Sequence, residues 1–448
     1  MLSNFIEVYK RVYELRADGS SRDEIYTKAR QGGWGNQEDV KLAFGMIHRD
    51  LKPAAFDRNE TLDDLDRDIE MQALKAEVTS YKRREKRLMG QADRANRLVE
   101  IFQANPVKIE PIPYRPVRVE GHRQVMVALS SDEHIQSRMT FERGHGINEY
   151  NVDLARQRMI YFAQRQIDYV QRYWREKNIT ALVDANLGDK FEGSIHDSDV
   201  TNEVEIAAAY KMWLKTKAEC YQMILKACPH LRIISLHVSG NHPRRTDKQD
   251  VDRPQNNDDC IAAEALRFAF ELAGIEQVEF VIPDSYFAIR NINGHLFLFE
   301  HSQFVRSWGG IPFYGLARRY GEYIQTLERT AEYQAAVVEA MRKPILAKGD
   351  DLILDDIPYI QKHYCGANFH TACKGIETAA GSIMLNGSLV GPNDFSLSLP
   401  RANQASQILF AVHPEFGPTD VTSIQLGHIR YPRQLKPAEV LDEITVMA

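Results

Sequence analysis

Side chains that can bind a divalent metal recur where five short apolar runs of the sequence end. The five endings are Ser131-Asp-Glu-His134, Gly188-Asp-Lys-Phe-Glu-Gly193, Gly240-Asn-His242, Glu300-His-Ser302 and Gly366-Ala-Asn-Phe-His370. Their carboxylate, imidazole and amide donors suit Mn²⁺, Fe²⁺ or Zn²⁺, and the lack of cysteine among them disfavours a structural zinc site. A carboxylate such as that of Asp189 could bridge two cations that hold a hydroxide and a phosphate for in-line attack. Hydrolysis of phosphate esters is therefore the chemistry that these residues favour.

The spacing of the motifs explains how they could meet in one site. The intervals from Asp132 to Asp189, Asn241, His301 and His370 are 57, 52, 60 and 69 residues. Each interval can hold one strand–helix–strand crossover, which needs about 30 residues or more. Parallel strands joined in this way present their carboxyl ends on one side, where α/β proteins bind ligands. Each motif alone is more often structural than functional, but the ordered set predicts convergence.

The hydrophobic pattern from about residue 120 onward predicts the α/β core that would position these motifs. Amphipathic stretches at 151–177, 203–228 and 257–273 separate most of the apolar runs, as in alternating strands and helices. Asn293-Gly294 stands between two apolar runs and predicts a β-hairpin. Short strands with glycine turns are expected after Gly381.

A helical arm is expected before this core. Residues 1–60 predict short helices around a glycine turn, compatible with a DNA-reading helix-turn-helix or with an ordinary small helical bundle. Residues 61–104 follow a heptad seam that only Glu85 interrupts, which predicts a coiled-coil-like helix about 60 Å long. Residues 105–118 read as a Pro-rich linker, and residues 119–448 as the core domain.

The long helix has two interpretations. Seven Lys and Arg residues gather between residues 82 and 97, and the heptad seam could pair two subunits. In one interpretation the helix forms a homodimer and its basic strip contacts nucleic acid; in the other it is a solvated helix that packs on its own chain. The sequence alone leaves both open.

The composition limits the classes of partner. The 448 residues carry 56 Lys and Arg against 62 Asp and Glu, a formal charge of −6, so any binding to nucleic acid must use a local patch. No apolar run reaches the roughly 18 residues of a membrane span, and the N-terminus lacks a signal-peptide pattern. The five cysteines are scattered without the spacing of a disulfide framework or a zinc site. A cytoplasmic protein without a membrane partner is expected.

The order Asp-x-His, Gly-Asp, Gly-Asn-His, His and a final histidine motif resembles that of the calcineurin-like metallophosphoesterases over roughly residues 120–430. The chain looks closest to phage-encoded members that are similar to SbcD-type DNA repair exonucleases. The stretches that support this are Gly146-Ile-Asn-Glu-Tyr-Asn151, Gly188-Asp-Lys-Phe-Glu-Gly-Ser-Ile-His196, Gly240-Asn-His-Pro-Arg244 and Asn386-Gly-Ser-Leu-Val-Gly391.

This resemblance implies a fold and an activity. The fold would be a two-sheet αββα metallophosphoesterase sandwich behind the helical arm. The activity would be that of a phosphodiesterase or nuclease acting on DNA with two divalent metal ions, Mn²⁺ first and Fe²⁺ or Zn²⁺ as alternatives. A phage-encoded protein would work in the host cytoplasm, and a partner ATPase is left open.

The resemblance also implies a role for each residue of the motifs. Asp132, His134 and His370 would bind the first metal, Asp189 would bridge, and Asn241 and His301 would bind the second metal. His242 would orient the phosphate and protonate the leaving oxygen. Asn368 stands where the family has a histidine for the second metal, so it would be a weak ligand, and His363 could substitute only if the loop bends.

The sequence leaves the role of Arg244 and the identity of the substrate open. Arg244 could clamp a substrate phosphate or be a solvated loop charge. Two other functions stay open: a phosphatase or phosphodiesterase for a small molecule or phosphoprotein, and a catalytically degenerate coiled-coil scaffold, which the departure at Asn368 allows.

Overall fold

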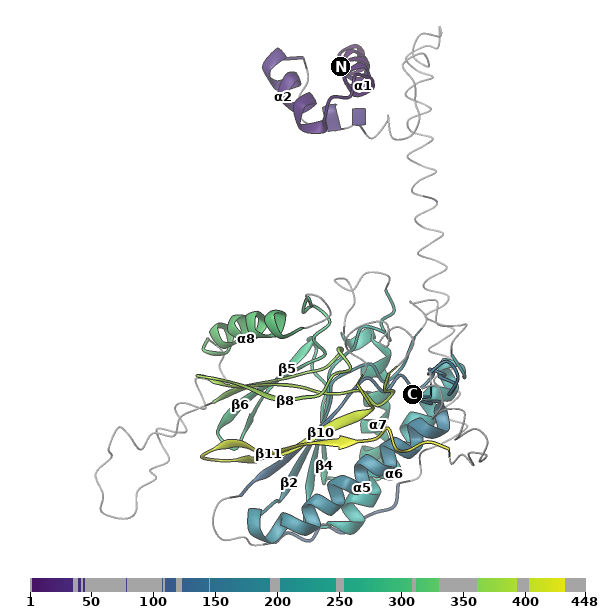
Figure 1. Cartoon of the computed structure of the whole chain (residues 1–448), viewed down its shortest axis with the longest axis vertical. Coiled ribbons are helices and arrows are strands. Elements are labelled where there is room, and N and C mark those ends of the chain that lie inside the picture. Colours follow the sequence, from purple (N-terminus) through teal and green to yellow (C-terminus); the bar gives the residue numbers. More distant parts are fainter. Residues whose placement is uncertain are drawn as a thin grey trace, which may run out of the picture. The chain divides into compact units, whose positions relative to one another are not determined.

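A computed structural model gives the architecture of the chain (Figure 1). It describes residues 2–34, 39–41, 43–44, 78, 107, 109–117, 123–144, 146–193, 202–246, 254–307, 312–329, 361–392 and 403–431. The chain divides into two compact units, Met1–Asn96 and Arg97–Ala448, and each is described by itself. Apart from Val78, the predicted coiled-coil-like helix over 61–104 and its basic cluster lie outside the described residues. The dimer seam and the nucleic-acid strip therefore stay predictions.

The first unit contains two short helices, α1 (Leu2–Ala17) and α2 (Arg22–Gly32). A capping box begins α2, because the Ser21 hydroxyl accepts from the Glu24 amide while the Glu24 carboxylate accepts from the Ser21 amide. A left-handed residue, Gly33, ends it. Apolar side chains from both helices and from residues 40–44 form a small core. A DNA-reading role for this bundle stays a prediction.

The second unit is built on a six-stranded sheet in the order β11-β10-β1-β2-β3-β4. Four of its strands run parallel, and the helices that connect them match the predicted amphipathic stretches. The parallel strands are β1 (Val125–Ser130), β2 (Ala181–Asn186), β3 (Arg232–His237) and β4 (Val278–Val281). The connecting helices are α5 (Val152–Lys177), α6 (Ile206–Ala227) and α7 (Asp258–Leu272), the last preceded by the short 3₁₀ helix Pro254–Asn256. The antiparallel strands are β10 (Ser406–His413) and β11 (Gly417–Gln425).

A second, five-stranded sheet has the order β5-β6-β7-β9-β8. The strands and the helix α8 have the bounds β5 (Phe287–Ile292), β6 (His295–Glu300), α8 (Phe313–Leu327), β7 (Lys362–Gly366), β8 (Cys373–Thr378) and β9 (Gly381–Leu385). The predicted hairpin joins β5 to β6, with Asn293 and Gly294 both at positive φ as a type I′ turn requires. The sequence analysis did not predict β8, whose side chains are mostly exposed and form no apolar run.

Three apolar clusters show how the layers stack. Met126 and Leu182 face α5 and α6 on one side of the first sheet, together with Trp213 of α6. On the other side, residues such as Val127 pack against Phe297 and other residues of the second sheet. The far face of the second sheet is covered by α8. The order helix–sheet–sheet–helix, also visible in Figure 1, confirms the predicted α/β two-sheet sandwich.

The Pro-rich segment is attached to this sandwich. Its described residues have no regular secondary structure, and Val107, Ile109 and Ile112 pack against the cluster beneath the helices. The Arg115 amide donates to the Pro229 carbonyl at 2.9 Å. At least residues 109–115 therefore belong to the surface of the second unit rather than spanning open solvent. None of the helices in the described part of the chain has both the length and the apolar character needed to cross a membrane.

Candidate metal centre

The candidate ligands all follow strand ends, as predicted, but they come from two sheets. Asp132 and His134 follow β1, Asp189 follows β2, and Asn241 follows β3, all at the carboxyl edge of the first sheet. The other two follow strands of the second sheet: His301 comes directly after β6, and His370 four residues after the end of β7. The sandwich brings these two edges together.

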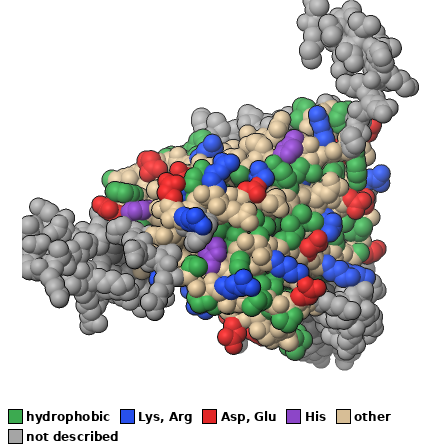
Figure 2. All heavy atoms as spheres, turned by 90° about the horizontal axis from the view of Figure 1, so that it is seen from below, with side chains coloured by type: hydrophobic (Ala, Val, Ile, Leu, Met, Phe, Trp, Pro, Cys, Tyr) green, Lys and Arg blue, Asp and Glu red, His purple; other side chains and the backbone are tan. Residues whose placement is uncertain are grey.

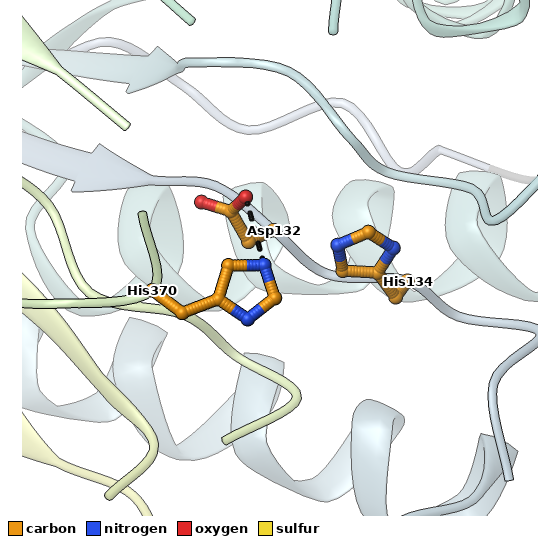
Figure 3. Close-up of side chains that lie close together, drawn as sticks. All are labelled: Asp132, His134 and His370. Atoms are coloured by element: carbon orange, nitrogen blue, oxygen red, sulfur yellow. Dashed lines mark ion pairs between the residues drawn. The ribbon is translucent and has the colours of Figure 1, made fainter. Parts of the chain in front are cut away.

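The first group of side chains consists of Asp132, His134 and His370, each of which offers one ligand atom within 4.8 Å of the others (Figure 3). His370 Nε2 lies 3.3 Å from Asp132 Oδ1, and the His134 and His370 rings are 5.2 Å apart. The backbone amide of Asn368 donates to Asp132 Oδ2 at 3.3 Å, which ties the last motif to the first. This is the set that the resemblance assigns to the first metal.

The second group adjoins the first through Asp189. His301 Nε2 lies 2.9 Å from Asp189 Oδ2 and 3.1 Å from Asn241 Oδ1. Asp132, Asp189 and His301 form a further group that could hold a metal ion, and His134 Nε2 lies 4.0 Å from Asp189 Oδ2. Asp189 Oδ2 thus contacts His301 and lies near His134, and Asp132 is a member of both groups. That these residues bind metal stays a prediction.

The orientation of the histidines fits a pair of divalent cations. Glu192 Oε2 lies 2.6 Å from Nδ1 of His134, and the carbonyl of Leu187 lies 2.6 Å from Nδ1 of His301. Both rings therefore turn Nε2 toward the carboxylates, which is how metal-binding histidines are usually fixed. Among the described residues, His134 Nε2 is buried without a hydrogen bond, whereas Asp132 Oδ1 has its ion pair with His370. Buried atoms of this kind need a partner, and a cation would be one.

In the metal-free chain these histidines attract protons. Burial lowers the pKa of His134, but the Glu192 carboxylate outweighs burial and the pKa rises to about 10. For His301 burial is likewise outweighed, here by Asp189, and the pKa rises to about 9. Positive charge at these ring nitrogens is thus favoured by the site, and a metal ion would supply it in place of the protons.

Asp259, at the start of α7, braces two of the ligand loops. Its buried carboxylate accepts the amides of Asp189 at 2.8 Å, Lys190 at 2.9 Å and Gly240 at 2.9 Å. Gly240 must be glycine, because a Cβ at this position would collide with Asp189 Oδ1. The sequence analysis missed Asp259, since an acidic residue after an N-cap asparagine is typical of any helix start.

A second brace holds the loop that carries Asp132. The amides of Leu389 and Val390 donate to the Asp132 carbonyl at 3.1 and 3.3 Å. Arg158, itself buried, donates to the Leu389 carbonyl at 2.8 Å, and the Asn148 amide group donates to the Val390 carbonyl at 2.9 Å. The stretches 146–151 and 386–391, noted above for their resemblance, therefore act as supports of the first ligand loop.

Glu133, between two candidate ligands, was also missed. Its carboxylate accepts from Asn186 at 2.9 Å and from the Trp213 indole at 2.6 Å, which turns it away from the centre and into the core. Burial raises the pKa of this carboxyl to about 7. The sequence Asp132-Glu133-His134 alone does not show that Glu133 is a buried support while its two neighbours are candidate ligands.

His242 lies at the mouth of the centre. Its Nδ1 is 3.2 Å from Glu192 Oε1, its backbone amide donates to Asp189 Oδ1 at 2.9 Å, and its ring meets His134 edge-on at 4.6 Å. The side chain is 25% exposed, in contrast to the fully buried His301. Glu192, the fourth residue of the Asp189 motif, thus organises two histidines, a role that the sequence analysis did not assign.

Arg244 and His363 each make hydrogen bonds to neighbouring residues of the chain. Arg244 donates to the carbonyls of Asn241 at 2.6 Å and Thr246 at 3.1 Å, so it braces its own loop. A contact between Arg244 and a substrate phosphate stays a prediction. His363 is buried near the start of β7, with Nδ1 2.9 Å from Ser382 Oγ, and it belongs to none of the ligand groups found among the described residues.

Comparisons with known proteins were made for the whole chain. No protein-family profile and no curated protein sequence matches it. A predicted phosphoesterase from Streptococcus pneumoniae is 9% identical, with 70% of this chain and 95% of that chain covered and a TM-score of 0.24. For Vps29 from Chaetomium thermophilum the values are 10%, 67%, 97% and 0.25, and for a dimetal phosphatase from Danio rerio 8%, 67%, 99% and 0.28. TM-scores this low decide neither the fold nor the activity.

Proposed function

We propose that this chain is a metal-dependent phosphoesterase with two divalent cations, and that its substrates are phosphodiesters of DNA. The observation that carries the proposal is that two groups of ligand-type side chains adjoin, with Asp189 of one group near His134 of the other. A single cation would not need a second group of donors beside the first, and the two groups share Asp132. Carboxylate and imidazole donors favour Mn²⁺, Fe²⁺ or Zn²⁺.

The chain's own residues supply the arrangement for hydrolysis. Asp132, His134 and His370 would hold one cation, and Asn241 with His301 the other. A bound pair of cations provides a Lewis acid and an activated water. His242 is positioned beside this centre with Nδ1 held by Glu192, which turns Nε2 away from Glu192. His242 is therefore the group that we assign to protonating the leaving oxygen.

DNA is proposed as the polymer on two grounds: the resemblance to DNA repair exonucleases, and the Lys and Arg cluster between residues 82 and 97. Basic and acidic side chains are interspersed on the described part of the face drawn in Figure 2, without a patch of one sign. The positive charge that would attract a polyanion must therefore lie elsewhere on the chain, and we propose that the N-terminal arm carries it.

Three substrates test the activity. Purified protein with Mn²⁺ is offered bis-p-nitrophenyl phosphate, p-nitrophenyl phosphate and linear DNA. Cleavage of the diester and of DNA is expected. Turnover of the monoester alone would replace the nuclease by a phosphatase, and no turnover with Mn²⁺, Fe²⁺ or Zn²⁺ would leave the scaffold interpretation. The Asp189→Asn variant serves as the control for contaminating nuclease.

Removing the arm tests its part in DNA binding. Because residues 109–115 pack on the second unit, the deletion should end before them, at residue 104. If three to five of the seven basic residues neutralise phosphates, the slope of log K against log salt on duplex DNA should fall by about 3–4. Turnover of the small diester should hardly change. An unchanged slope would remove the arm from the DNA argument, and a change from dimer to monomer on deletion would support pairing through the heptad seam.

A further inference from the structure

Aromatic side chains gather on the surface beside His301. Phe304 is three residues beyond this candidate ligand, so their Cα atoms are at most about 11 Å apart. Phe304 is 42% exposed although it is a large apolar residue. The Val305 amide donates to the Ser302 carbonyl at 3.0 Å and folds this loop back into a tight turn. Phe304 is thus an exposed ring on the short loop that directly follows the candidate ligand His301.

Tyr286 completes a pair with Phe304. The register of the β5–β6 hairpin places Phe287 opposite Glu300, so Tyr286 precedes β5 at the level of His301. The rings of Tyr286 and Phe304 meet edge-on, 5.2 Å apart and inclined at 81°. This geometry fixes the orientation of both rings, because edge-to-face pairs are a preferred arrangement of aromatic side chains.

The first turn of α8 extends the same surface. A Cβ on Gly315 would collide with the carbonyl of Arg306, so the helix begins directly against the loop that carries Phe304. Two further aromatic residues begin this helix, and both are exposed: Phe313 at 42% and Tyr314 at 79%. Arg306 is also exposed and adds a positive charge.

We infer that Tyr286, Phe304, Phe313 and Tyr314 form a stacking platform for unpaired nucleobases that flank a phosphodiester bound at the candidate centre. The inference rests on the proposed function, because a phosphodiester held beside His301 brings its neighbouring nucleosides to this surface. The exposed rings of Phe304, Phe313 and Tyr314 can stack on the faces of bases, which are covered in a duplex, and the half-buried Tyr286 orients Phe304. The platform therefore points to single-stranded DNA, or to strand ends whose bases have separated.

A binding experiment tests the platform. The Kd of a short labelled phosphorothioate oligothymidylate and of an abasic strand with the same linkages is measured by fluorescence anisotropy with Mn²⁺, so that the centre keeps its cations while cleavage is slow. The variants are Phe304→Leu and Tyr314→Leu, which keep an apolar side chain and remove the ring. Loss of one stacked base should weaken binding of the thymidylate by about 5- to 150-fold and leave the abasic strand unchanged.

Phe416→Leu is the matched control. Phe416 is 61% exposed and lies in the turn between β10 and β11, at the opposite edge of the first sheet, where β10 ends beside the start of β1. Its substitution should change neither Kd. If the wild-type chain binds both oligonucleotides equally, or if the platform variants lose both equally, stacking is ruled out.

Two further results bear on the platform: the self-association of its variants, and the cleavage of DNA, which tests the proposed function separately. A change in self-association of the platform variants with unaltered oligonucleotide binding would make the patch an interface between copies of the chain, and the inference would fall. Because the assay needs no catalysis, the inference can also fail while metal-dependent DNA cleavage is observed. A selective loss on the base-bearing strand supports the platform whatever the cleavage assay shows.

Discussion

Residues with a left-handed backbone (positive φ) occur both at the carboxyl edge of the sandwich, where the candidate ligands lie, and away from it, and different contacts hold them. Among described residues other than glycine, this conformation occurs away from the centre in turns and in one bulge, at Asn178, Asn293 and Asp420. At the carboxyl edge it occurs at Ser302 and at the candidate ligands Asp132, His134, Asp189, Asn368 and His370. A residue other than glycine that is held in this conformation costs of order 1–3 kcal/mol.

The difference lies in what holds each conformation. The Asn293 side chain itself donates to the carbonyls of Arg123 at 2.7 Å and Val412 at 2.8 Å, so this turn is stabilised by its own residue. Asp189 depends instead on a distant carboxylate, since its amide is accepted by Asp259. At the ligand edge the conformation is thus held by a side chain from another element rather than by the residue's own side chain, and this strained backbone points to a functional site.

A matched pair of aspartates could break this comparison. Asp189 has φ 55° and Asp420 has φ 54°, so the same change to Asn perturbs the backbone equally at both. Asp189→Asn should abolish turnover, by more than about 10³-fold, because both cations lose a shared carboxylate. Metal analysis should show fewer than two cations per chain, whereas Asp420→Asn should keep both the metal and the activity. Two tightly bound cations in Asp189→Asn would refute the bridging role.

His242 lies at the same edge as the candidate ligands but is not assigned as a ligand. Its substitution can therefore separate a loss of catalysis from a loss of metal. His242→Asn should lower kcat by about 10²–10⁴-fold, the contribution of a positioned acid, while the metal content stays that of the wild type. The measurements are diester turnover and metal analysis of the same preparation. Loss of a cation in this variant would make His242 a ligand instead.

The architecture could be predicted because local patterns determine it. The amphipathic stretches became α5, α6 and α7, and Asn293-Gly294 formed the expected hairpin, since each signal depends on residues that are neighbours in sequence. The order of the motifs also sufficed to place the candidate ligands in one region. What the sequence could not give is the supporting shell, because Asp259 and Arg158 act on loops far away along the chain.

Asp259 tests how far the ligand edge depends on that shell. Asp259→Asn leaves at least one buried amide without an acceptor, so the free energy of unfolding should fall by about 1–3 kcal/mol. Urea unfolding of the metal-free protein measures this. Asp420→Asn removes a half-exposed ion pair with Lys177 and should lower the same quantity by at most about 1 kcal/mol. Equal losses in the two variants would contradict the distinction between the edges.

Asn293 and Asn368, both at positive φ, give the smallest expected change in the free energy of unfolding. Asn293→Gly should lower the unfolding free energy by about 1–2 kcal/mol, because two hydrogen bonds are lost. Asn368→Gly should change that of the metal-free protein by less than about 0.5 kcal/mol. Its φ of 74° is easy for glycine, and within the described residues only its backbone amide bonds, to Asp132.

Added Mn²⁺ then separates a ligand from a loop residue at position 368. A cation that binds only the folded chain stabilises it in proportion to the logarithm of its concentration over Kd. If the Asn368 amide oxygen is a weak ligand, Asn368→Gly raises the Kd of one cation, and a tenfold rise removes about 1.4 kcal/mol of that stabilisation at saturating Mn²⁺. Asn293→Gly should keep the full Mn²⁺ effect. Identical Mn²⁺ dependence of wild type and Asn368→Gly would mean that the second cation is held without residue 368, and the departure from the family pattern would then cost the centre nothing.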